Sequence, residues 1–160
     1  MGEAALKGAP RHAWPLMTPT RMARFGDHRF PAPVVATDGA AAIDLYSTVD
    51  AMIPRGEVVS VGTGWAFSIP AGWCGLVIPR SGAGSKQRIR LANTMGVIDS
   101  DYRGEVVLKL TCDAPVARIR AGKPIAQMVV VPCLTGLVEV ASLAALGETA
   151  RGSGGFGSTD

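Results

Sequence analysis

The stretch GVIDSDYRGEV, residues 96–106, places four charged side chains around one tyrosine. Only 18% of the 160 residues are charged, so this density is far above the average of the chain. Two interpretations fit the stretch taken alone. It is either a solvated hairpin turn or a rigid hairpin that holds a catalytic carboxylate, Asp99. Other motifs are needed to decide between them.

A second stretch, IPRSGAGSKQ (78–87), is a glycine-rich turn with many hydrogen-bond donors. Arg80 and Ser81 supply side-chain donors, and Gly82 leaves its backbone N–H group unobstructed. Backbone and side-chain donors in such a turn can hold phosphate oxygens. The spacing is not that of a P-loop. Alone, the stretch predicts either a phosphate site or an ordinary polar turn.

Two further polar residues lie in positions that suggest a site. Asp44 interrupts the apolar stretch AAAIDLYS, where an inward carboxylate requires a cation or another polar partner. An Asp on the solvent face fits that stretch equally well. Asn93 precedes Asp99 by six residues, and a hairpin over residues 91–107 would let it line a slot for a planar ring.

The tail RGSGGFGST (151–159) is rich in glycine and has almost no apolar residue except Phe156. One interpretation is a nucleic-acid-binding segment of the RGG type. A single repeat in a chain of net charge +3 disfavours it. The other is a mobile lid in which Arg151 clamps a phosphate, Phe156 stacks on a base, and Ser158 and Thr159 add hydroxyl groups.

The elements that would position these residues are strands. Short apolar runs separated by 20 glycines and 11 prolines predict an all-β fold, closed or sandwiched as a barrel. Helical periodicity is nearly absent, with at most one turn over 82–87 and two over 140–148. The expected strands cover residues 41–47, 57–62, 64–69, 72–78, 104–112, 125–131 and 136–140.

The cysteine count, the net charge and the distribution of apolar residues exclude several classes of protein. Three cysteines without metal-ligand spacing indicate reduced, buried thiols in a cytoplasmic protein. The small net charge argues against a nucleic-acid or anionic-membrane partner, and no run is long and apolar enough to span a membrane. The acid-poor N-terminus lacks the apolar region of a secretory signal, and we expect a floppy extension rather than a transit peptide.

Taken together and in order, five motifs resemble those of the trimeric dUTP diphosphatases (dUTPases). The resemblance runs from about residue 36 to residue 160. It implies a distorted jelly-roll-like β-barrel of the dUTPase β-clip type, forming a homotrimer whose active sites are shared between subunits. It also implies an N-terminal extension over 1–33, a barrel domain over 34–146 and a mobile arm over 147–160 that closes over the active site. The motifs are AAAIDLYS, PRSGAGSK, NTMGVIDSDYRGE, GKPIAQ and RGSGGFGST.

The resemblance implies hydrolysis of dUTP to dUMP and pyrophosphate with Mg²⁺ as cofactor, which keeps uracil out of DNA and supplies dUMP for thymidylate synthesis. Asp99 matches the general base that activates the water attacking the α-phosphorus. Tyr102 matches the residue whose ring lies under the deoxyribose and leaves no room for a 2′-hydroxyl. Asp44 matches a position that supports the metal indirectly, through water.

The resemblance assigns the other contacts by position. Uracil and deoxyribose contacts are expected from Asn93, Gly96, Val97, Ile98, Tyr102 and Phe156. Phosphate contacts are expected from Arg80, Ser81, Gly82, Gln127, Arg151, Gly157, Ser158 and Thr159. The expected partners are dUTP, dUMP and two further copies of the chain.

The chain departs from the family pattern in two places. Lys123 and Pro124 replace the usual Asp-Arg pair of the fourth motif, and Ala83 and Gly84 replace a Leu-Ala pair, which should loosen the helical turn there. The rival dCTP deaminase has a catalytic glutamate where this chain has Lys109, and it lacks the glycine-rich arm. A second rival is a catalytically silent binding trimer, and the intact Asp99, Tyr102 and Arg151 argue against it. A third is an RNA-binding trimer that uses the basic extension, for which only four cationic residues speak.

Overall fold

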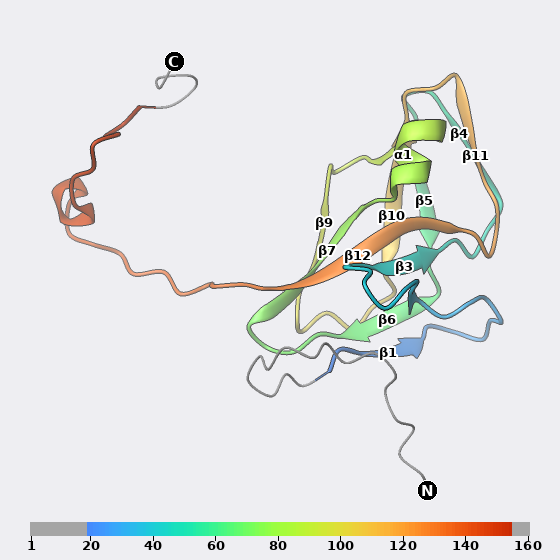
Figure 1. Cartoon of the computed structure of the whole chain (residues 1–160), viewed down its shortest axis with the longest axis horizontal. Helices are drawn as coiled ribbons and strands as arrows, with labels where there is room; N and C mark the ends of the chain where they lie inside the picture. Colours follow the sequence, from blue (N-terminus) through green and yellow to red (C-terminus); the bar gives the residue numbers. More distant parts are fainter. Residues whose placement is uncertain (1–18, 155–160) are drawn as a thin grey trace, which may run out of the picture.

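The structure is a computed structural model of the chain, and it describes residues 19–154. Those residues form short strands, one α-helix and one 3-10 helix, as the sequence predicts for an all-β fold (Figure 1). No helix among residues 19–154 is long and apolar enough to cross a membrane. The elements are β1 (Arg21–Arg24), β2 (Val34–Val35), β3 (Ile43–Tyr46), β4 (Ala51–Pro54), β5 (Val59–Gly62), β6 (Trp65–Ser68), β7 (Trp73–Pro79), α1 (Ser81–Gln87), β8 (Ile89–Leu91), β9 (Gly96–Ile98), β10 (Val107–Cys112), β11 (Val116–Ile119), β12 (Pro124–Pro132) and η1 (Leu143–Leu146).

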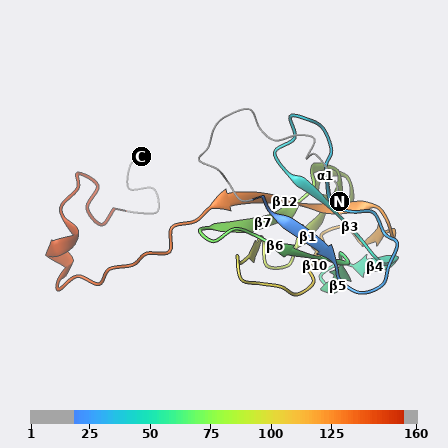
Figure 2. The same cartoon turned by 90° about the horizontal axis from the view of Figure 1, so that it is seen from below.

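The strands pair only in the antiparallel sense. The largest sheet has the order β2-β3-β12-β7-β9, a second sheet has the order β5-β10-β8, and β1 pairs with β6 and β4 with β11. Long connections between sheets are visible in both views (Figure 2). Side chains from different sheets pack into one core, which includes the fully buried Leu45, Ile53, Val61, Leu110 and Met128.

Residue alternation explains why the central strands form where they do. In β10, Leu108 and Leu110 are buried while Val107 and Lys109 are exposed, as expected for a strand with one face on the core. Six of the seven predicted strands coincide with β3, β5, β6, β7, β10 and β12. Six short strands were not predicted, because runs of two to four residues carry too little periodicity.

The seventh predicted strand, over residues 136–140, is wrong for this single chain. Those residues leave the barrel after β12 as an extended segment without a strand partner (Figure 1). Leu137 is 96% exposed and Val138 is 88% exposed. The reason is physical: an apolar, β-branched pattern favours an extended conformation, but a strand also requires a neighbour to complete its hydrogen-bond ladder.

The described part of the N-terminal region packs against the barrel through β1. Arg24 lies over the ring of Trp65, with 4.8 Å between the guanidinium carbon and the ring centroid. The same guanidinium donates hydrogen bonds to the carbonyls of His28 and Phe30, at 3.0 and 3.1 Å. The Trp65 indole donates to the carbonyl of Pro31 at 3.1 Å. These contacts fix residues 21–31 against β6.

Candidate active site

The turn that follows β9 carries Asp99 and Tyr102. β9 pairs with β7, with Gly96 opposite Val77 and Ile98 opposite Gly75. Asp99 comes directly after the strand, and its exposed side chain faces a shallow pocket of about 170 Å³. The lining of this pocket brings together four predicted site residues: Val97, Ile98, Asp99 and Tyr102.

Two other charged residues of this stretch, Arg103 and Glu105, bind backbone groups. Arg103 donates from one guanidinium nitrogen to the carbonyls of Ser100 and Tyr102, at 2.7 and 2.8 Å. Glu105 accepts a hydrogen bond from the backbone N–H of Gly64 at 2.7 Å. Of the four charged residues, only Asp99 is predicted from the sequence to be a site residue. The high local charge was a signal that further charged residues here, Arg103 and Glu105, have structural partners.

Asn93 lies apart from this pocket. It occupies the exposed turn between β8 and β9, where its carbonyl accepts a hydrogen bond from Met95 N–H at 2.7 Å. The pocket around Asp99 is lined without it. β9 therefore separates Asn93 at one end from Asp99 at the other, although both belong to one motif.

Three predicted residues from three different motifs meet near the end of β7. Asp44 on β3 is buried, and its Oδ1 lies 2.9 Å from Nε of Arg80. Gln127 is the register partner of Asp44 on β12, and its amide donates to the carbonyl of Pro79 at 3.3 Å. Of the two orientations considered for Asp44, the inward one is therefore correct, and its cationic partner is Arg80.

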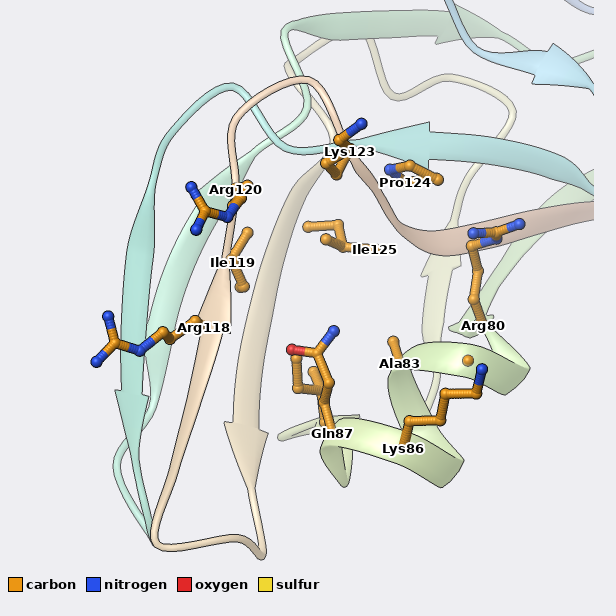
Figure 3. Close-up of a pocket in the computed structure, with 12 residues that line it drawn as sticks. Arg80, Ala83, Lys86, Gln87, Arg118, Ile119, Arg120, Lys123, Pro124 and Ile125 are labelled. Carbon is orange, nitrogen blue, oxygen red and sulfur yellow. The ribbon is translucent and has the colours of Figure 1, made fainter.

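A cationic cleft of about 500 Å³ opens beside this group, between α1 and the segment that joins β11 to β12 (Figure 3). Its floor is apolar and includes Ile119 and Ile125. Figure 3 shows the Gln87 side chain extending into the opening, with the cations around the rim. No carboxylate lines the cleft among the described residues, so it favours anions. The cationic lining residues are Arg80, Lys86, Arg118, Arg120 and Lys123.

The described part of the C-terminal segment, residues 136–154, extends away from the barrel and from both groups (Figure 1). Arg151 belongs to this segment, and its Nε donates to the carbonyl of Gly154 at 2.8 Å. Phe156, Gly157, Ser158 and Thr159 lie outside the described residues. Within one chain the described candidate residues thus lie in separate places: the Asp99 turn, Asn93 in the turn before β9, the Arg80 group and the C-terminal segment.

Cys74 is a buried thiol on β7, the strand that pairs with β9 just before Asp99. Burial raises the pKa of the Cys74 thiol, and the nearby Cys133 and Asp99 raise it further. A raised pKa keeps the thiol neutral and poorly nucleophilic near pH 7. This supports a packing role for Cys74. Among residues 19–154 no group of three or more His, Cys, Asp or Glu side chains is arranged to hold a metal ion.

Comparison with known proteins gives a consistent result. The dUTPase family model matches residues 28–160. The deoxyuridine 5′-triphosphate nucleotidohydrolase of Rhizobium etli is 45% identical over 132 residues, which cover 79% of this chain and 83% of the relative. The fold resembles that of a Staphylococcus bacteriophage 80alpha dUTPase mutant solved with dUpNHpp. Its TM-score is 0.78 at 23% identity, covering 89% of this chain and 99% of that one.

A mutant dUTPase from phage phi11 of S. aureus, whose structure describes the coordination of a structural Mg(II) ion, also matches. Its TM-score is 0.71 at 22% identity, with 79% of this chain and 99% of that chain covered. The fold and the family match together define a nucleotide hydrolase built on a β-clip. Within that class, the chain belongs to the dUTPase family. The resemblance of the five motifs is thereby confirmed, and the protein is an enzyme, a dUTP diphosphatase.

Proposed function

We propose that this enzyme hydrolyses dUTP to dUMP and pyrophosphate by in-line attack of a water on the α-phosphorus, with Asp99 as general base. The observation that carries the proposal is the position of Asp99. Its carboxylate is exposed at the end of β9, beside the pocket that Val97, Ile98 and Tyr102 also line. Removing dUTP in this way keeps uracil out of DNA and supplies dUMP for thymidylate synthesis.

Selection of uracil follows from the edge position of β9. β9 is the last strand of its sheet, so one side of its backbone has no strand partner among the described residues. Backbone N–H and C=O groups from Gly96 to Ile98 can then pair with a planar pyrimidine. Cytosine presents a donor where uracil presents an acceptor, which would leave polar groups unpaired. Asn93 contributes from the turn before β9, and Tyr102 excludes a 2′-hydroxyl.

We assign the triphosphate to the group around Arg80. Ser81 and Gly82 are exposed at the start of α1, and Gln127 lies on the adjacent strand. Mg²⁺ prefers oxygen ligands and retains several waters, so it would be held largely by the phosphates. When bound, it would neutralise charge on the phosphate oxygens. Asp44 fits a supporting role through water, since its carboxylate is an oxygen donor already oriented by Arg80.

A homotrimer would bring the separate groups together. One subunit would supply the Asp99 turn, a second the Arg80 group and a third the arm with Arg151, Phe156, Gly157, Ser158 and Thr159. The segment after β12 supports this proposal, because it exposes several apolar residues in succession, from Leu134 at 102% to Leu146 at 69% exposure. Contiguous exposed apolar surface is typical of a protein–protein contact. The free thiols are consistent with a cytoplasmic enzyme.

Hydrolysis of dUTP in ¹⁸O-labelled water tests the proposed point of attack. The label should appear in dUMP and not in pyrophosphate, because the water oxygen bonds to the α-phosphorus. Mass spectrometry of both products measures this directly. Label in pyrophosphate would show attack on the β-phosphorus and would contradict the role assigned to Asp99.

A further inference from the structure

The ring of Tyr102 occupies space that is available only because residue 104 is glycine. A Cβ placed on Gly104 would lie 2.6 Å from Cζ of Tyr102, 3.0 Å from Cε2, and closer still to the hydroxyl oxygen. Such distances are far below van der Waals contact. Gly104 does not have the left-handed conformation, so steric room and not backbone geometry requires glycine here.

Glu105 ties the same ring to the barrel. The Tyr102 hydroxyl donates to the backbone carbonyl of Glu105 at 2.9 Å. The Glu105 carboxylate in turn accepts the N–H of Gly64, in the turn between β5 and β6, at 2.7 Å. Gly62 leaves room for this carboxylate, since a Cβ there would lie 2.5 Å from its Oε1. The ring position is therefore coupled to β5 and β6 through Glu105.

The residue after Glu105 is fixed to buried structure. Val106 N–H donates to the carbonyl of Trp65 at 2.9 Å. The Val106 carbonyl accepts from both the hydroxyl and the N–H of Thr63, at 2.8 and 3.2 Å. Val106 and Thr63 are both buried. Glu105 is thus anchored to a rigid part of the barrel through Gly64 and Val106. Its backbone carbonyl in turn holds the Tyr102 hydroxyl.

We propose that Gly104 and Glu105 are positioning residues that fix the Tyr102 ring and so set the preference for deoxyribonucleotides over ribonucleotides. This inference rests on the proposed function, in which Tyr102 excludes the 2′-hydroxyl. Steric exclusion requires a wall that does not move. Tyr102 is 44% exposed, and without these contacts its ring would rotate away from the sugar.

The variant Gly104→Ala tests the steric part. The added methyl group meets the far end of a side chain, so the ring moves while the backbone keeps its conformation. The ratio of kcat/KM for dUTP to that for UTP should fall by at least about 10-fold, while the melting temperature changes little. Gly39→Ala is the matched control, because a Cβ at Gly39 meets nothing within 4 Å. It should leave the ratio unchanged.

Two substitutions of Glu105 test the coupling. Glu105→Gln retains an oxygen that can accept the Gly64 N–H, so its dUTP:UTP ratio should stay near that of the wild type. Glu105→Ala removes the acceptor and should lower the ratio. A merely structural residue would reduce turnover of both nucleotides equally.

A third variant keeps the test valid if Gly104→Ala does not fold. Tyr102→Phe removes the hydrogen bond to the Glu105 carbonyl and should also lower the dUTP:UTP ratio.

The outcomes separate this inference from the proposed function. A wild-type enzyme that does not hydrolyse dUTP would contradict the proposed function itself. If the wild type strongly prefers dUTP, folded Gly104→Ala and Glu105→Ala variants that keep its ratio would overturn the role of Gly104 and Glu105.

Discussion

At the scale of single residues, the charges between residues 99 and 105 have different tasks. Arg103 binds two carbonyls of its own turn, and Glu105 binds the backbone of Gly64. Asp99 is placed beside the pocket. The sequence showed the charges and their spacing, and the family resemblance selected Asp99. The partner of Glu105 could not be predicted, because Gly64 is 41 residues away in the chain. The partners of Arg103 are backbone carbonyls of its own turn, and they depend on the shape of that turn.

Asp99→Asn should slow turnover by about 10²–10⁴-fold, because an amide cannot accept the proton from the attacking water. Affinity for a non-hydrolysable dUTP analogue should be nearly unchanged. Single-turnover kinetics and calorimetric titration measure the two quantities. Asp101→Asn on the same turn is the control and should keep wild-type turnover. Equal losses of binding and turnover in Asp99→Asn would make Asp99 a structural residue.

Arg80→Ala should lower the free energy of unfolding, because it leaves the buried Asp44 carboxylate without its cation. Arg80 is partly exposed, so solvent screening limits the expected loss to about 1–2 kcal/mol. Adding Asp44→Asn to Arg80→Ala should recover part of that loss, since no unpaired charge remains buried. Urea unfolding of the four variants forms the double-mutant cycle. If the two substitutions changed the free energy of unfolding in a strictly additive way, the Arg80 and Asp44 side chains would not be energetically coupled.

At the scale of elements, period-two alternation located the strands that face the core. β9 was not predicted, because it has only three residues and is defined by its pairing with β7. The segment 136–140 was predicted as a strand because it has the composition of one, but the chain alone offers it no partner. Contacts such as that of Tyr102 with Gly104 depend on side-chain placement, which periodicity does not describe.

Deleting residues 151–160 should leave a folded protein with poor turnover. The described part of this segment lies away from the barrel (Figure 1), so its removal exposes no core. Loss of the segment should reduce turnover, because in the proposed mechanism its closure excludes water and positions the γ-phosphate. Phe156→Ala should be milder, since one stacking contact contributes about 1–3 kcal/mol. Circular dichroism measures whether each variant is folded, and steady-state kinetics measures its turnover. Unfolding of the truncated chain would contradict the proposal that this segment acts as a lid.

At the scale of the whole molecule, the exposed apolar segment after β12 and the dispersed site groups both point to assembly. Light scattering should give a mass of three chains of 16.6 kDa. Leu137→Glu should weaken the proposed trimer, because it would place a charge in the proposed subunit contact, where burial is costly. Glu139→Gln is a nearby control that should keep the trimer. A monomeric wild-type protein with full activity would contradict the shared active site.

The measurement that tests the central claim most directly is pyrophosphate release by the purified protein with Mg²⁺, comparing dUTP, UTP, dCTP and dTTP. The β9 edge and the Tyr102 ring together predict release from dUTP and little or none from the other three. Comparable release from UTP would contradict the role of Tyr102, and comparable release from dCTP would contradict the uracil slot. Ammonia from dCTP without pyrophosphate would show the chemistry of a deaminase and would contradict the function proposed for Asp99.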